Sequence, residues 1–295
     1  MSTGNPKTLF DSLVDEALKS RAELALLRPV VEKELLHHDI LREMSGAGLL
    51  SGLTFIGGTC LRACYGSSRL SEDLDFTGGK DFKRSDLAEL TKVLKETLGT
   101  RYGLKVAVSE PVREEGKGKV STWKMSVETR PGRKDMQAQR IHLDICAIPS
   151  HDPRPMMLRT LYGVDMGTSG LILQAESREE ILADKVIALA FREGRIKNRD
   201  LWDIAWLRQQ GVDLPAQLIP IKIHDHGRTR EEFHSLLQGR VEELKSSEAL
   251  RKDFINEMRR FLPSAVIAQT VDQEPYWRYL TQVISEEVEK AIAAF

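Results

Sequence analysis

The sequence has few cysteines and no long apolar run, and both absences narrow the class of protein. Three cysteines in 295 residues, at irregular spacing, are too few for a disulfide framework or a four-cysteine zinc site. We therefore expect reduced thiols and a cytoplasmic protein. No stretch approaches the roughly 18 apolar residues of a transmembrane helix, and the first 21 residues lack the apolar core of a secretory signal. A secreted or membrane-spanning protein is not expected.

The sequence also lacks an excess of either basic or acidic residues. Lysine and arginine number 43 against 44 aspartate and glutamate, so the overall charge of −1 favours neither nucleic acid nor a membrane surface as a partner. With 41% hydrophobic and 29% charged residues, the composition is that of a folded globular chain rather than a disordered one. A chain of this length buries roughly 75% of its unfolded surface, so a core forms without a structural metal.

The hydrophobic pattern divides the chain into two parts. Residues 8–48 and 84–99 have the three-to-four spacing of helices, and residues from about 178 onward are helical to the C-terminus. Short alternating or apolar runs predict strands at residues 53–56, 73–76, 120–128 and 140–148. We therefore predict an N-terminal α/β domain over residues 1–175, with a mixed sheet flanked by helices. An all-helical C-terminal domain is predicted over residues 176–295.

Two glycines follow the first predicted strand. Gly57 and Gly58 let the backbone approach a ligand closely, because no Cβ stands in the way. We expect Thr59 to be the N-cap of a short helix, whose free N–H groups would favour a phosphate in the same space.

Asp73 and Asp75 lie two residues apart on a predicted strand, so their carboxylates project from one face. Ser71 is expected on that face as well. Adjacent carboxylates repel each other unless a cation lies between them, and their oxygen atoms suit Mg²⁺. The alternative is an ordinary solvated loop.

Asp144 is a third candidate acid, placed between apolar residues of a later strand. Its side chain points away from the core side, and a carboxylate there needs a partner or a metal. The alternative is an ion pair with Arg140 on the exposed strand face.

Two helical segments carry further candidates. Lys185 lies on an otherwise apolar helix face, where its ammonium could reach a triphosphate or could simply cover the core with its stem. On the next helix, Arg199 and Asp203 could form an intrahelical pair or contact substrate. Asp203 is favoured over Asp200 because apolar residues frame it, but the sequence leaves this choice open.

Residues 112–140 hold a local excess of basic residues around Trp123, against four acidic residues. The basic residues are Arg113, Lys117, Lys119, Lys124, Arg130, Arg133, Lys134 and Arg140. This segment could face RNA or could be a solvated surface. His37 and His38, on the N-terminal helix, are expected to be solvated.

These motifs resemble, in order, those of the polymerase-β-like nucleotidyltransferases. The finer pattern resembles the AbiEii/AbiGii toxin family of type IV toxin–antitoxin systems, which includes the MenT toxins. The matching residues are Gly57, Gly58, Thr59, Leu61, Arg62, Arg69, Ser71, Asp73, Leu74, Asp75, Phe76, Asp144, Lys185, Arg199, Asp200 and Asp203. They extend over residues 57 to 203, about half of the chain.

The resemblance implies a magnesium-dependent transfer of a nucleotide from a nucleoside triphosphate to an RNA acceptor, the 3′ end of tRNA, which inhibits translation and growth. It also implies an antitoxin encoded alongside. Asp73, Asp75 and Asp144 would bind the metal, and Lys185 and Asp203 would act with them in catalysis. The residues implied in nucleotide binding are Gly57, Gly58, Thr59, Arg69, Ser71, Lys185 and Arg199.

Two other functions remain compatible with the sequence. One is nucleotidyl transfer to a small molecule, as in aminoglycoside-modifying enzymes, which would share the core chemistry. The other is a non-enzymatic RNA- or protein-binding module in which the acids are structural.

Overall fold

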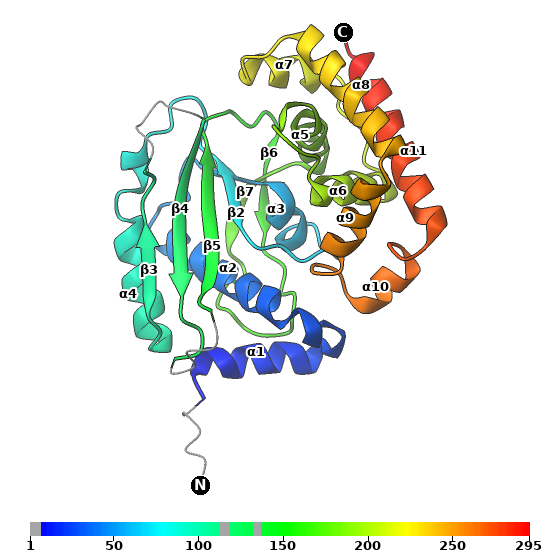
Figure 1. The fold of residues 1–295 in the computed structure, drawn as a ribbon. Helices are drawn as coiled ribbons and strands as arrows, with labels where there is room; N and C mark the ends of the chain where they lie inside the picture. The colour runs from blue at the N-terminus through cyan, green and yellow to red at the C-terminus, as the bar shows by residue number, and fades with distance from the viewer. Residues whose placement is uncertain (1–6, 113–118, 132–136) are drawn as a thin grey trace.

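A computed structural model describes residues 7–112, 119–131 and 137–295 (Figure 1). Seven strands form one mixed sheet in the order β3-β4-β5-β2-β1-β7-β6. The strands are β1 (Thr54–Ile56), β2 (Leu74–Thr77), β3 (Val106–Ser109), β4 (Val120–Val127), β5 (Gln139–Cys146), β6 (Pro153–Met157) and β7 (Ile172–Glu176). The predicted α/β fold with a mixed sheet is confirmed.

Helices surround the sheet, and those after β7 gather on one side of it in Figure 1. Before β7 lie α1 (Leu9–Ser20), α2 (Arg28–Gly46), α3 (Gly57–Ala63), α4 (Leu90–Tyr102) and the 3₁₀ helices η1 (Ala22–Leu27) and η2 (Arg84–Leu87). After it lie α5 (Arg178–Phe191), α6 (Asn198–Gln209), α7 (Leu218–Asp225), α8 (Arg230–Ser246), α9 (Glu248–Met258), α10 (Ser264–Gln269) and α11 (Glu274–Ile292). None of the helices in the described ranges is long and apolar enough to span a membrane.

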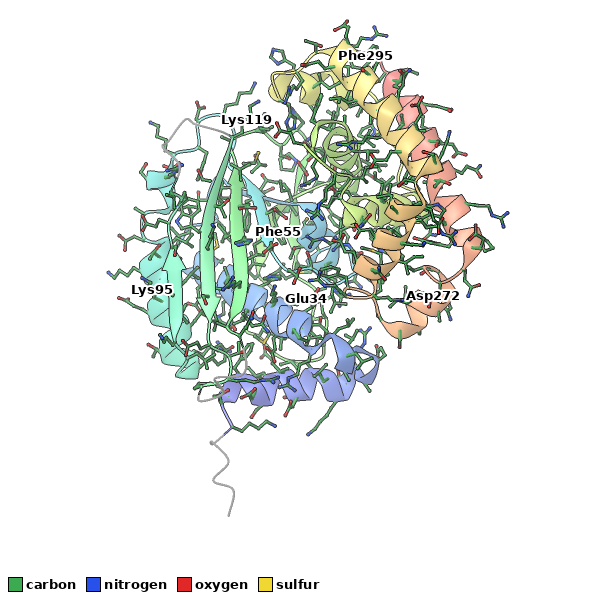
Figure 2. All side chains as sticks on the ribbon, in the orientation of Figure 1. Glu34, Phe55, Lys95, Lys119, Asp272 and Phe295 are labelled. Carbon is green, nitrogen blue, oxygen red and sulfur yellow. The ribbon has the colours of Figure 1, made fainter. Side chains whose placement is uncertain are left out.

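The sheet has one apolar face and one face that carries the acids. Phe55 of β1 pairs with Phe76 of β2, and both are buried; Figure 2 shows Phe55 near the middle of the molecule. Along β5, Leu143 and Ile145 are buried on this same face, as the alternating pattern predicts. Helix α2 packs against β5, and α4 packs against β3. The opposite face of β2 and β5 therefore carries the polar residues of the alternation.

The fold differs from the sequence-based expectation at one turn of the candidate site. The expected N-cap at Thr59 is wrong, because α3 begins at Gly57 and the N-cap position is Ile56. Gly57 has φ +74°, a left-handed conformation that glycine adopts without strain, so the chain turns directly from β1 into the helix.

Candidate active site

Two carboxylates lie side by side near the point where β1 ends, and a third, that of Asp73, immediately precedes β2. Asp75 and Asp144 are directly paired neighbours on the parallel strands β2 and β5, whose backbones lie about 4.8 Å apart. Ile56 is the partner of Asp75 on the other side, so Gly57 follows at the edge of the site. A Cβ on Gly57 would lie 3.2 Å from Asp75 Oδ2, so a larger residue would crowd this carboxylate.

The charges of Asp75 and Asp144 are poorly compensated. Asp144 Oδ1 is buried and has no hydrogen-bond partner, and Asp144 forms no ion pair with Arg140 in the described part of the chain. Burial raises the pKa of Asp75; Lys197 lowers it, and Asp144 raises it further. This pair of acids therefore has the electrostatic character of a cation site.

Asp73 lies immediately before β2 and, unlike Asp144 Oδ1, its carboxylate has a hydrogen-bond partner. Its Oδ1 accepts a hydrogen bond of 3.0 Å from the backbone N–H of His142, and His142 Nδ1 lies 3.5 Å away. The hydroxyl of Thr59 donates to the carbonyl oxygen of Asp73 and lies 2.6 Å from Ser71 Oγ. Thr59 and Ser71 are both buried, so they brace the chain that presents Asp73.

Arg69 and Asp203 form a buried bidentate ion pair next to Gly58. Arg69 Nε and Nη2 each donate to one carboxylate oxygen of Asp203, both at 2.8 Å, and both residues are almost fully buried. A Cβ on Gly58 would lie 2.2 Å from Arg69 Nη2. Gly58 is therefore needed to leave room for this ion pair, which joins the segment before β2 to α6.

The same network holds Lys185. Its ammonium contacts Asp200 Oδ1 at 2.6 Å and Asp203 Oδ2 at 2.9 Å, so α5 and α6 are joined through both acids. Despite its burial, the charges of Lys185 and Lys197 lower the pKa of Asp200 well below its usual range. The structure thus brings together Lys185, both acids of α6 and Arg69.

Arg199 does not join this network. The intrahelical pair with Asp203 that its spacing allowed is not formed, because Asp203 faces Arg69. Arg199 instead contacts Glu257 at 3.3 Å and Glu72 at 3.8 Å.

Lys197, which immediately precedes α6, was not singled out from the sequence. It is half-buried, and its side chain forms no ion pair or hydrogen bond with the residues that the structure describes. Burial lowers its pKa, and its charge acts on both Asp200 and Asp75. It follows a loop without a periodic pattern, so no spacing in the sequence connects it to the acids.

The residues present are compatible with a magnesium ion. Among the described residues, no three acidic, histidine or cysteine side chains are arranged as a complete metal site. Mg²⁺ does not require one, because it is commonly bound by one or two carboxylates together with substrate phosphates. The free buried oxygen of Asp144 beside Asp75 supplies that kind of donor pair.

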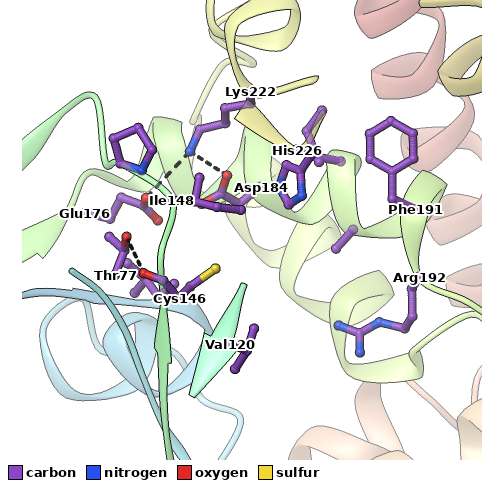
Figure 3. Close-up of a pocket in the computed structure, with 14 residues that line it drawn as sticks. Thr77, Val120, Cys146, Ile148, Glu176, Asp184, Phe191, Arg192, Lys222 and His226 are labelled. Atoms are coloured by element: carbon purple, nitrogen blue, oxygen red, sulfur yellow. Dashed lines mark hydrogen bonds and ion pairs between the residues drawn. The ribbon is translucent and has the colours of Figure 1, made fainter. Parts of the chain in front are cut away.

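A cavity of about 480 Å³ opens on the same sheet face, between the sheet and α5 and α7 (Figure 3). It is lined by Ile56, Thr77, Val120, Cys146, Ile148, Pro149, Glu176, Asp184, Ile187, Ala188, Phe191, Arg192, Lys222 and His226. Thr77 and Cys146 come two residues after Asp75 and Asp144 on their strands, so the cavity adjoins the acids.

A glycine turn, adjacent strand acids and a nearby cavity are features of enzymes that bind phosphorylated ligands. The family model described as "Nucleotidyl transferase AbiEii toxin, Type IV TA system" matches residues 39–282. The chain therefore belongs to this family of nucleotidyltransferase toxins, and the predicted resemblance is confirmed. Membership implies a nucleoside triphosphate substrate and an antitoxin partner.

Two solved structures from Helicobacter pylori are similar in outline. JHP933 is 18% identical, with 89% of this chain and 93% of that chain covered and a TM-score of 0.49. A protein described as a candidate nucleotidyltransferase is also 18% identical, with 88% and 96% covered and a TM-score of 0.48. No curated protein matches the sequence.

Proposed function

We propose that the protein transfers a nucleotide from a nucleoside triphosphate to the 3′ end of tRNA in a magnesium-dependent reaction, and that this modification inhibits translation and growth. The observation that carries the proposal is the pair Asp75 and Asp144, adjacent on parallel strands, with one buried carboxylate oxygen that has no hydrogen-bond partner among the described residues. Family membership supports nucleotidyl transfer and a toxin role. The RNA acceptor rests on the sequence resemblance and on the basic residues of β4 and β5.

Within this proposal, Asp75 and Asp144 hold Mg²⁺ and Asp73 completes the set of acids. When bound, the ion stabilises the entering and leaving oxygens of an in-line displacement at the α-phosphate. Asp73 is oriented for this by the N–H of His142. We also assign to Asp144 the acceptance of the proton of the attacking hydroxyl.

The remaining residues of the proposed site bind and orient the substrate. Gly57 and Gly58 leave the backbone open to phosphates, and Thr59 and Ser71 fix the segment beside them. Lys185 contributes positive charge toward the departing pyrophosphate, although two acids already hold its ammonium.

We assign a structural role to Arg69 and Asp203, because neither is accessible to a ligand. Their ion pair holds α6 next to Gly58. Lys197, which lacks an ion-pair partner in the described residues, is the better candidate for a direct contact with the triphosphate. Arg199, placed with Glu72 and Glu257, is assigned to the edge of the site.

An acceptor RNA would reach the acids across the exposed face of β4 and β5. Asp144, His142 and Arg140 alternate along this face of β5, and Lys124 of β4 is paired with His142. Lys124 and Arg140 are exposed and form no ion pair with any described residue. Four of the other basic residues predicted to face RNA, Arg113, Lys117, Arg133 and Lys134, lie outside the described ranges.

The proposal is tested by incubating the protein with bulk tRNA, Mg²⁺ and each α-labelled nucleoside triphosphate in turn. Label on tRNA that requires Mg²⁺ and is lost in Asp75→Ala is the expected result. Absence of label with all four nucleotides would exclude tRNA as acceptor, and label on an added aminoglycoside would instead support the small-molecule alternative.

A further inference from the structure

Both peptide groups that flank Asp73 are held by side chains from other elements. The carbonyl oxygen of Glu72, in the peptide group before Asp73, lies 3.0 Å from His37 Nε2 of α2. The carbonyl oxygen of Asp73 itself, in the peptide group after it, accepts from the hydroxyl of Thr59 in α3. Because a peptide group is planar, fixing its carbonyl also fixes the plane that meets the Cα of Asp73. These two contacts together set the direction in which the Asp73 side chain leaves the backbone.

His37 is a buried donor with one unused nitrogen. Only 2% of the residue is exposed. A carbonyl oxygen can only accept, so Nε2 carries the proton that is shared with Glu72. Nδ1 is then an acceptor, and it is buried with no hydrogen-bond partner among the described residues. The cost of leaving such an atom unpaired is at least as large as the net gain from one hydrogen bond. Stability alone therefore does not account for an imidazole at this position.

Helix α2 supports the same segment with a second side chain. Glu34, one turn before His37, accepts a hydrogen bond of 2.9 Å from the backbone N–H of Ser71, and it is almost fully buried (Glu34 in Figure 2). The same helix packs against β5, the strand that carries Asp144. One helix therefore sets the position of the segment that ends at Asp73 relative to the strand of Asp144.

We propose that His37 is a positioning residue of the metal site. Through the peptide group of Glu72 it orients the carboxylate of Asp73 for the ion that Asp75 and Asp144 also hold. Being almost fully buried, His37 acts through the backbone rather than by touching the ion or the substrate. The proposal rests on the magnesium-dependent transfer proposed above, which assigns the ion to these acids.

Two amide substitutions at His37 differ in how far they reach. The NH₂ group of glutamine lies about as far from the backbone as Nε2 of histidine, so His37→Gln can still donate to Glu72. The NH₂ group of asparagine lies near the position of Nδ1, so His37→Asn loses this bond. His38→Asn is the matched control, because it makes the same change at the next position of α2, where the imidazole contacts Thr168 instead.

Binding of Mn²⁺ in place of Mg²⁺, followed by the electron paramagnetic resonance signal of the free ion, measures the effect without nucleotide or RNA. We expect His37→Asn to bind Mn²⁺ about tenfold to a hundredfold more weakly than the wild type, the usual effect of removing a group that orients a metal ligand. His37→Gln and His38→Asn should keep close to wild-type affinity. Thermal melting shows whether each variant folds. If His37→Asn does not fold, His37→Leu, which buries no amide, removes the same bond.

The outcomes separate this inference from the proposed function. Wild-type affinity for Mn²⁺ in a folded His37→Asn or His37→Leu protein, or an equal loss in His37→Gln, would overturn the positioning role even if tRNA is labelled. Mn²⁺ binding that is absent from the wild type, or is unchanged by Asp75→Asn, would overturn the positioning role together with the metal site of the proposed function. Weaker binding in His37→Asn that is restored in His37→Gln would support the positioning role even if no label reaches tRNA.

Discussion

At the scale of single residues, the site is built on charges that the folded chain does not neutralise. Asp75 and Asp144 face each other across neighbouring strands with little compensation, whereas Arg69, Lys185, Asp200 and Asp203 neutralise one another. Substitutions at the first group should therefore affect chemistry, and substitutions near the second should affect stability.

Asp75→Asn should reduce nucleotidyl transfer by roughly a hundredfold or more, the typical effect of removing one electrostatic interaction with a transition state. Because burial raises the pKa of Asp75, its charge is unfavourable in the fold, so the melting temperature should stay unchanged or rise. Label transfer and thermal melting measure the two effects. Asp81→Asn, on an exposed loop residue, is the matched control, and full activity in Asp75→Asn would show that the site assignment is wrong.

Gly58→Ala should destabilise the protein by about 3 kcal/mol, because the new Cβ would displace Arg69 from Asp203 and disrupt a buried ion pair. Gly239→Ala, in α8 with no described atom within 4 Å of its Cβ position, should instead stabilise the protein by up to about 1 kcal/mol. Urea unfolding of both variants measures the contrast. If the two variants are equally stable, Gly58 is not needed to leave room for the ion pair of Arg69 and Asp203.

His38 should make stability fall in mild acid. The sequence-based expectation that His37 and His38 are solvated is wrong: both are buried, and His38 Nδ1 lies 2.9 Å from the hydroxyl of Thr168. Burial lowers the pKa of His38 from 6.5 to about 4, so between these values the unfolded chain binds a proton that the folded chain does not. His38 therefore does not lower the free energy of unfolding above pH 6.5. As the pH falls toward 4, protonation of His38 in the unfolded chain lowers this free energy by about 3 kcal/mol.

Urea unfolding between pH 7 and pH 4 measures this decline. His38→Asn places an amide near the Thr168 hydroxyl and does not titrate, so its stability should depend less steeply on pH than that of the wild type. Parallel pH profiles for the two proteins would rule out His38 as the cause.

At the scale of elements, α6 is held to the sheet region through Asp203, which accepts from Arg69 and also contacts Lys185. Asp203→Asn should cost about 3 kcal/mol of stability, since two buried cations lose their common partner. Asp213→Asn removes an exposed ion pair with Arg208 and should leave stability almost unchanged. Denaturant midpoints compare them, and an Asp203→Asn protein of wild-type stability with impaired transfer would indicate a direct substrate role instead.

The sequence predicted the elements with a strong periodic pattern and missed those defined by partners. Strands β2, β4 and β5 were predicted within a few residues, because their alternation reports one buried face. β6 contains two prolines and is mostly exposed, and β7 is recognisable only through its pairing with β1 and β6. The helix predicted over residues 84–99 is two elements, η2 and α4.

For the candidate site, the order of residue types along the sequence indicated which residues to consider, but it did not indicate which of them are in contact. Asp75 and Asp144 lie together as the motif implies, although no local pattern specifies which strands are neighbours. The partner of Asp203 is Arg69, far away in the sequence, rather than Arg199 four residues before it. Local spacing cannot reveal such an ion pair, because tertiary packing decides which side of α6 is buried.

At the scale of the whole molecule, a balanced net charge leaves RNA binding to a local surface. Simultaneous Lys124→Ala and Arg140→Ala should weaken tRNA binding and lower the slope of log affinity against log salt by about 2, because each of the two removed cations would neutralise one phosphate. Affinity for nucleoside triphosphate should be unchanged. Lys92→Ala with Lys95→Ala, on the exposed side of α4, is the control of equal charge (Lys95 in Figure 2). An unchanged salt dependence in the first double variant would place the RNA elsewhere.

The ion pair behind Gly58 has a consequence for how the protein is made. Arg69 emerges from the ribosome long before its partner Asp203 in α6. An unfinished chain therefore lacks the ion pair that lies next to Gly58. Synthesis must continue through α6 before the three acids acquire their final surroundings. For a member of a toxin family, we expect from this order of assembly that products ending before α6 lack the assembled site, so that nucleotidyl transfer begins only with chains that extend past α6.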